Sequence, residues 1–140
     1  MRVSVLLLVY AGMLLSGCST VQTQRDPKAD LSHFKHFYVE HRLTDDHHLD
    51  ELIVAELQAL GCEASAGPLT MMPQSAEAIV NYQDAWAWDF KSYLFQLDLQ
   101  IRDSRKDRLL ASGTYRQPSM ITKSPAEVIH VILTPLFKRS

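Results

Sequence analysis

The feature that most constrains the fold is a two-residue alternation in the middle of the chain. Between residues 93 and 102, apolar side chains occupy every second position and polar ones the positions between, with Leu94 as the exception. The apolar set is Tyr93, Phe95, Leu97, Leu99 and Ile101, and the polar set is Gln96, Asp98, Gln100 and Arg102. A strand points successive side chains to opposite faces, so this pattern predicts a strand with one buried and one wet face. The polar turn "DSRKD" and the following "RLLASGTYRQ" then predict a β-hairpin over residues 91–116.

The preceding segment, residues 76–90, alternates as well and carries both tryptophans of the chain. One face would carry Ala78, Val80, Tyr82, Trp86, Trp88 and Phe90, and the other Asn81, Gln83 and Asp89. We expect the aromatic face to pack beneath helices. The alternative is that Trp86 and Trp88 form an exposed surface that binds a partner protein, a lipid or a glycan, because tryptophan is enriched in binding hot spots.

Two segments have the pattern of amphipathic helices. Residues 43–61 place apolar side chains at helical spacing, with Thr44 or Asp45 as the expected N-terminal cap and Gly61 as the stop. Near the C-terminus, Ser124 and Glu127 form a capping-box pattern, and a proline further along should end or kink that helix at residues 134–135.

An aromatic segment at residues 33–40 predicts a first strand ahead of these elements. The order strand, helix, strands, helix predicts an α+β fold. We expect a two-layer sandwich, a mainly antiparallel sheet of about four to five strands with two helices packed on one face.

The N-terminus has the pattern of a secretion signal. Met1 and Arg2 precede an apolar run over residues 3–15, which ends in the small residues Ser16 and Gly17 before Cys18. Leu15-Ser16-Gly17-Cys18 resembles the lipobox of bacterial lipoproteins. The resemblance implies cleavage after residue 17, a lipid on the Cys18 sulfur and attachment to a membrane. Ser19 follows where lipoproteins of the inner membrane often carry Asp, which favours the outer membrane of a Gram-negative cell, with the domain facing the periplasm.

The remaining chain suits one domain. We expect a signal peptide over residues 1–17, a lipidated flexible tether over residues 18–30, and a single periplasmic α+β domain over residues 31–140. The net charge of −2 is ordinary for a globular protein and argues against a nucleic-acid partner. Cys62 is the second cysteine; we expect a small buried residue, and the alternative is a thiol that pairs between chains.

The start of the expected domain has a second resemblance. "RDPKADLSHFKHF", residues 25–37, is similar to the opening of a family of uncharacterised bacterial envelope lipoproteins with an Asp-Pro-x-Ala-Asp-Phe-Ser-x-Tyr-Lys-Thr-Phe-like motif. The matching residues are Asp26, Pro27, Ala29, Asp30, Ser32, Lys35 and Phe37, while Leu31, Phe34, His36 and Val39 differ from the usual types. "AEAIVNY" and "LDLQIRDSRKDRLLASGTY" also resemble its middle strands. The resemblance implies an α+β lipoprotein domain and transfers no catalytic residue.

Candidate chemistry in the sequence is sparse. His47 or His48 with Glu51 has a spacing that could hold zinc, but no further ligand completes a motif, so we expect no metal and no cofactor. Asp84 and Asp89 could act as a carboxylate pair on a glycan, but nothing fixes their separation. We therefore expect no enzyme and no catalytic residue. The expected function is binding of another envelope component, with Trp86 and Trp88 as the possible partner-binding residues. The alternative is a periplasmic small-ligand or metal-binding lipoprotein.

Overall fold

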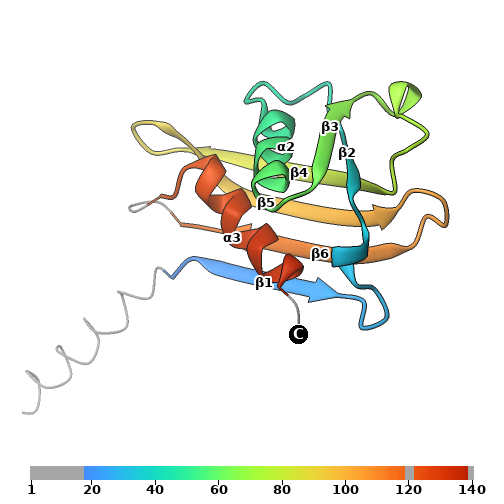
Figure 1. Cartoon of the computed structure of the whole chain (residues 1–140). Helices are drawn as coiled ribbons and strands as arrows, with labels where there is room; N and C mark the ends of the chain where they lie inside the picture. Colours follow the sequence, from blue (N-terminus) through green and yellow to red (C-terminus); the bar gives the residue numbers. More distant parts are fainter. Residues whose placement is uncertain (1–17, 119–121, 139–140) are drawn as a thin grey trace, which may run out of the picture.

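The structure, a computed structural model, describes residues 18–118 and 122–138. It contains one six-stranded sheet and two α-helices (Figure 1). The strands are β1 (Thr20–Arg25), β2 (His36–Glu40), β3 (Glu63–Gly67), β4 (Ala78–Trp88), β5 (Ser92–Asp103) and β6 (Leu109–Arg116). The helices are α2 (Leu49–Ala59) and α3 (Pro125–Phe137), and two short 3-10 turns are η2 (Leu31–His33) and η3 (Leu69–Met71). The predicted signal peptide lies outside the described residues.

The sheet is mixed, with the strand order β1-β6-β5-β4-β2-β3. β4, β5, β6 and β1 are antiparallel neighbours, whereas β2 runs parallel to both β4 and β3. The parallel pairs arise because α2 connects β2 to β3, and a crossover helix returns the chain to the same end of the sheet. The predicted α+β class is confirmed, with six strands in place of the expected four to five.

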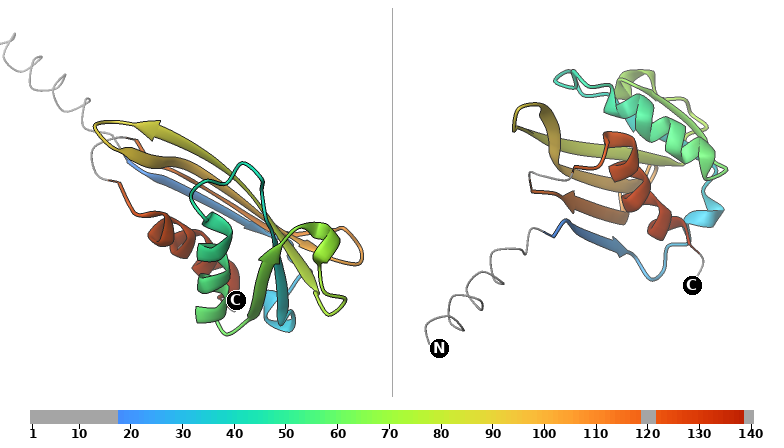
Figure 2. Two further views of the ribbon diagram at one scale, coloured as in Figure 1. Left: turned by 90° about the horizontal axis from the view of Figure 1, so that it is seen from above. Right: turned by 90° about the vertical axis from the view of Figure 1, so that its left-hand side faces the viewer.

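Both helices cover the same face of the sheet, and its other face is bare (Figure 2). The core lies between the layers. It is built from alternate residues of the long strands, such as Val80, Leu97 and Leu99, and from one stripe of each helix, including Ile53 and Ile132. The strand alternation and the helical spacing therefore predict which side chains meet in the core.

The start of α3 was predicted correctly and its end was not. At α3, Ser124 and Glu127 form the capping box, as expected. We expected the helix to stop or kink at residues 134–135, and the stop is wrong, because α3 continues through Pro135 to Phe137. Pro135 lies in the last turn, where it removes only one backbone donor, and the turn is held by the burial of Leu136 and by the Phe137 ring 5.6 Å from that of Phe37.

The segment assigned to a tether differs from the expectation. Residues 20–25 form β1, which pairs along its whole length with β6, and Ala29 is buried in the core. The pattern gave no signal because β1 is an edge strand in which five of the six residues are exposed and only Val21 is apolar.

None of the helices in the described part of the chain has the length and apolar character needed to cross a membrane.

Candidate functional site

The open face of the sheet is polar across four adjacent strands. The pairing places Gln24, Ser112, Gln100 and Asn81 in one row, and Gln22, Thr114, Asp98 and Gln83 in the next. All of these residues are exposed or half-buried. They are the in-between positions of the alternation, so the same strands that fill the core present amides, hydroxyls and carboxylates to solvent.

A shallow hollow lies on this face. It has a volume of about 420 Å³, and its lining includes Glu40, Arg42, Asn81, Asp98 and Thr114. Several polar side chains at this hollow are hydrogen-bonded to one another. Asn81 donates to the Glu40 carboxylate, and Asp98 accepts hydrogen bonds from the Thr114 hydroxyl at 2.6 Å and from the Gln96 amide at 2.9 Å. We call this surface the polar hollow.

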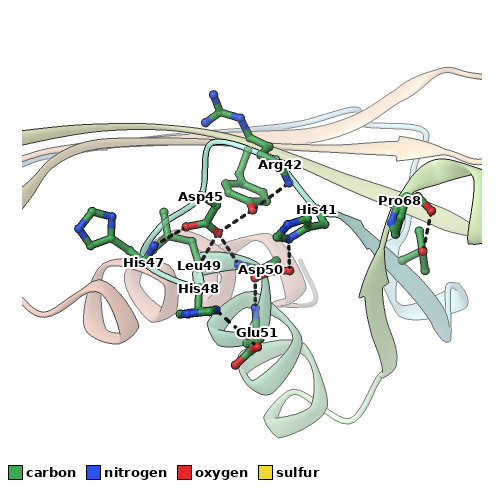
Figure 3. A network of polar contacts seen from close by, with 11 residues as sticks. His41, Arg42, Asp45, His47, His48, Leu49, Asp50, Glu51 and Pro68 are labelled. Atoms are coloured by element: carbon green, nitrogen blue, oxygen red, sulfur yellow. Dashed lines mark hydrogen bonds and ion pairs between the residues drawn. The ribbon is translucent and has the colours of Figure 1, made fainter.

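On the helix side, a buried carboxylate organises the start of α2 (Figure 3). Asp45 accepts hydrogen bonds from the backbone N–H groups of His47, Leu49 and Asp50, the shortest being 2.7 Å to Leu49. It also accepts the Tyr82 hydroxyl at 2.7 Å. Asp45 thus satisfies amides that have no partner within the helix and joins the helix to β4. The helix begins later than predicted, at Leu49, and His48 occupies the N-cap position in place of Thr44 or Asp45.

These contacts set the ionisation of Asp45. Burial raises the pKa of the carboxyl, but the hydrogen bonds from Tyr82 and from the three backbone amides outweigh it and hold the pKa below its ordinary value. Burial and the neighbouring carboxylate raise the pKa of Tyr82 above its ordinary value. Asp45 is therefore a charged structural anchor and Tyr82 is its neutral donor.

A second polar chain leads from the polar hollow towards the first tryptophan. The Arg42 guanidinium lies 2.5 Å from the Asp84 carboxylate, and the other oxygen of Asp84 accepts the Trp86 indole N–H at 2.7 Å. The His47 ring stacks on Trp86 with 3.6 Å between ring centroids. Trp86 is thus half-buried and fixed on both its edge and its face, so it packs as part of the domain.

Trp88 has a different environment from Trp86. It is 76% exposed at the end of β4, and Phe90, in the turn to β5, is 95% exposed. The β4–β5 hairpin extends beyond both helices, so nothing covers its end (Figures 1 and 2). The expectation of an aromatic face packed beneath the helices is correct for Val80 and Tyr82 and wrong for Trp88 and Phe90.

The histidines do not gather into a metal site. His48 lies 3.6 Å from Glu51, while His47 stacks on Trp86 and its backbone N–H is held by Asp45. The His41 ring is hydrogen-bonded to the Asp50 carboxylate, with 2.7 Å between Nδ1 and Oδ2. Within residues 18–118 and 122–138, no three His, Cys, Asp or Glu side chains lie together in a way that suits a metal ion.

The remaining candidates lie apart from one another. Asp84 is committed to Arg42 and Trp86, whereas Asp89 is exposed in the β4–β5 turn. Cys62 is a free, half-buried thiol whose pKa burial raises, as for an inert cysteine. Cys18 is free and exposed at the first described position.

Sequence reasoning missed two parts of this arrangement. The contribution of Gln22 and Gln24 to the open face was missed because β1 was not expected. The link between Asp45 and Tyr82 joins residues 37 positions apart, and a local pattern carries no signal for such a contact.

Comparison with known proteins rests on structure. No protein-family model and no curated protein matches the sequence. Two solved structures of the PelC dodecamer from Paraburkholderia phytofirmans share the fold with TM-scores of 0.63, at 16% and 17% identity, over 87% and 88% of this chain and 100% of the other. A DUF4136 family protein from Bacteroides thetaiotaomicron matches with a TM-score of 0.53 and 11% identity, over 85% of this chain and 97% of that one. At these identities the likeness is one of fold, and this fold is shared with a family of unknown function.

Proposed function

We propose that the protein is an outer-membrane lipoprotein, anchored by a lipid on Cys18, whose non-catalytic periplasmic domain binds another envelope protein through the open face of its sheet. The observation that carries the proposal is the polar hollow together with the two polar rows around it. A broad face, left uncovered by both helices, presents alternating hydrogen-bonding side chains and no apolar core.

The character of this face favours a protein partner. Polar, water-accessible groups form the rim of transient protein interfaces, and such interfaces are no more apolar than ordinary surface. The carboxylates of the polar hollow accept hydrogen bonds from neighbouring amides and hydroxyls, not from each other. Both carboxylates are thus already engaged by neutral donors of the same surface, and we propose that they serve binding.

Self-association is one form that such binding can take. PelC, which has the same fold, is described as a dodecamer. In this chain the sheet ends in two edge strands, β1 and β3, which have no outer neighbour in the sheet order. A second copy of the chain is therefore the first partner to look for.

Site-specific photo-crosslinking in cells tests the proposal. A benzophenone side chain at Gln100, on the open face, should form a discrete adduct with an envelope protein or with a second copy. The same group at Lys106, exposed in the β5–β6 turn, is the matched control. The Cys18→Ala variant should leave the membrane fraction and lose the adduct. Absence of a Gln100-specific adduct in the anchored protein would reject the open face as the binding surface.

A small ligand is the second candidate, because a volume of about 420 Å³ falls in the range of ligand pockets, roughly 300–1,000 Å³. Native mass spectrometry of protein purified from the envelope separates the two. A stoichiometric bound mass that is lost in the Asp98→Ala variant would favour the ligand over the protein partner.

A further inference from the structure

The end of the β4–β5 hairpin combines two aromatic side chains with a charged residue on each side of Phe90. We define the aromatic tip as Trp88, Asp89, Phe90 and Lys91. Trp88 and Phe90 are among the most exposed large apolar side chains of the described residues. Phe90 has a φ of 58°, a left-handed conformation that bulky residues rarely adopt. The turn therefore directs an aromatic ring away from the protein in a conformation that glycine or asparagine would adopt more easily.

The strand register places the aromatic tip at the same end of the sheet as Cys18. Thr20 pairs with Arg116, which pairs with Gln96, so Thr20 and Gln96 lie at one level. β1 and β5 are both antiparallel to β6, so they run in the same direction and their N-terminal ends point the same way. Both views of the ribbon show the hairpin and the start of β1 at this end (Figures 1 and 2).

The distances along the strands fit a common surface. At about 3.3 Å per residue, the Trp88–Ser92 pair lies about 10 Å beyond the level of Thr20 and Gln96 when counted along β4, and about 13 Å when counted along β5, which holds one extra residue at the register shift. An extended Cys18 reaches about 7 Å beyond the same level. A membrane that holds a lipid on Cys18 would therefore meet the aromatic tip first, with the tip about 3–6 Å deeper than the Cys18 backbone.

The chemistry of this end suits phospholipid headgroups. Tryptophan is enriched at the membrane–water interface, because its ring is apolar and its N–H is polar. Lys91, Arg116 and Lys123 lie at this end with Asp89 and Glu127, so three positive charges face two negative ones and favour anionic headgroups. The basic turn at residues 104–108 joins the opposite ends of β5 and β6 and so points away from this surface.

We propose that the aromatic tip inserts into the headgroup region of the phospholipid bilayer that holds Cys18, as a second contact that fixes the orientation of the domain. The inference rests on the proposed lipid anchor. With the tip and Cys18 both at the membrane, the strands stand away from the bilayer. The polar hollow, on the side of the sheet, stays accessible to a partner.

The test holds the chain at a vesicle whether or not the cell lipidates it. The chain from Cys18 onward, which contains every strand and both helices, is produced with Cys62→Ser and coupled through its Cys18 thiol to a maleimide phospholipid. The vesicles contain phosphatidylethanolamine and phosphatidylglycerol. With Trp86→Phe, Trp88 is the single tryptophan, and its emission is excited selectively over that of tyrosine. We expect its emission to shift to the blue on coupling, to be quenched by lipids brominated near the headgroup, and to be shielded from aqueous acrylamide.

A matched reporter sits at the other end of the sheet. Leu109, 41% exposed and paired with Arg102, is changed to Trp in a chain with Trp86→Phe and Trp88→Phe. This reporter should keep its red emission and remain open to acrylamide. Red, acrylamide-quenched emission from Trp88 in the coupled protein would overturn the inference and leave Trp88 free for a protein partner. Lipid quenching of both reporters would show a domain lying flat, which also overturns it.

A separate experiment tests the proposed lipid anchor. If the Cys18→Ala variant floats with native membranes as the wild type does, lipid anchoring through Cys18 is wrong, while the maleimide experiment still measures whether the aromatic tip enters a bilayer held at that position.

Discussion

The two faces of the sheet share one hydrogen-bonded backbone and carry opposite chemistry. On the helix side, Leu99 contributes to a core in which its neighbours are apolar and fully buried. One residue later, Gln100 points to solvent beside Ser112 and Asn81. The difference teaches that a single alternating strand serves two purposes here: one face stabilises the domain, and the other is available for binding.

The comparison also holds along the hairpin of β4 and β5. Near its base, Tyr82 is buried, whereas Trp88, on the same face of β4 by strand alternation, is 76% exposed. The end of the hairpin extends beyond both helices (Figure 2). Side-chain orientation alone does not bury a residue; a covering layer must be present at that height.

The sharpest test of the two faces compares adjacent residues. Leu99→Ala removes buried methyl groups and leaves a cavity, so we expect the free energy of unfolding to fall by about 2–5 kcal/mol. Gln100→Ala should change it by about 0.5 kcal/mol or less. Urea unfolding followed by circular dichroism measures both. A cost for Gln100→Ala as large as that for Leu99→Ala would mean that the open face is part of the stabilising structure.

The second test concerns how closely α3 approaches the sheet. Gly113 in β6 pairs with Leu99, and a Cβ at this position would overlap the Cγ2 methyl of Ile132 in α3. We expect Gly113→Ala to lower the free energy of unfolding by about 1–3 kcal/mol through overpacking. Adding Ile132→Leu removes the Cγ2 methyl and should recover part of the loss. If the loss of unfolding free energy in the double variant equals the sum of the losses in the two single variants, the overlap is not the cause.

The outcome of the sequence predictions follows the range of the interactions involved. The capping box of Ser124 and Glu127 is a contact over three residues, and the core positions of residues 78–82 and 97–101 follow from a period of two, so these were predicted from local sequence. The prediction was wrong nearer the hairpin, where Leu94, the expected exception, is in the core and Phe95 is only half-buried, because the register of β4 and β5 shifts between Ala85 and Trp86. The α+β class followed from the order of these elements.

The features that were missed depend on distant parts of the chain. β1 is defined by its pairing with β6, more than eighty positions away, and Val21 is its single apolar residue. The exposure of Trp88 depends on how far the N-terminal ends of α2 and α3 extend along the sheet. The continuation of α3 past Pro135 depends on the packing of Leu136 and Phe137. No periodicity within a segment carries this information.

The smallest expected effect concerns a buried charged group on the covered side of the sheet, next to the start of α2. Asp45 is 7% exposed, yet its carboxylate has four hydrogen-bond donors. Asp45→Asn keeps the shape and replaces one accepting oxygen by a donor that faces other donors. We expect a loss of about 0.5–2 kcal/mol at neutral pH, as for other N-terminal caps. The Asp45→Asn variant thus tests whether a buried carboxylate stabilises the covered side of the sheet when all its hydrogen bonds are satisfied.

The pH dependence separates the charge of Asp45 from its shape. The pKa of Asp45 is lowered in the folded protein, so between the folded and unfolded values the unfolded chain binds more protons, and stability falls as the pH decreases. The contribution is complete above the ordinary carboxyl value of about 3.9 and disappears as the pH falls through the folded value. The wild type should therefore lose its advantage over Asp45→Asn in acid, in urea unfolding at neutral and at acidic pH. Glu77, Asp103 and Glu127 also have lowered pKa values but are common to both proteins, so the difference isolates Asp45. An advantage that is equal at both pH values would mean that Asp45 acts through geometry, because a neutral acceptor of the same shape would then stabilise α2 equally well.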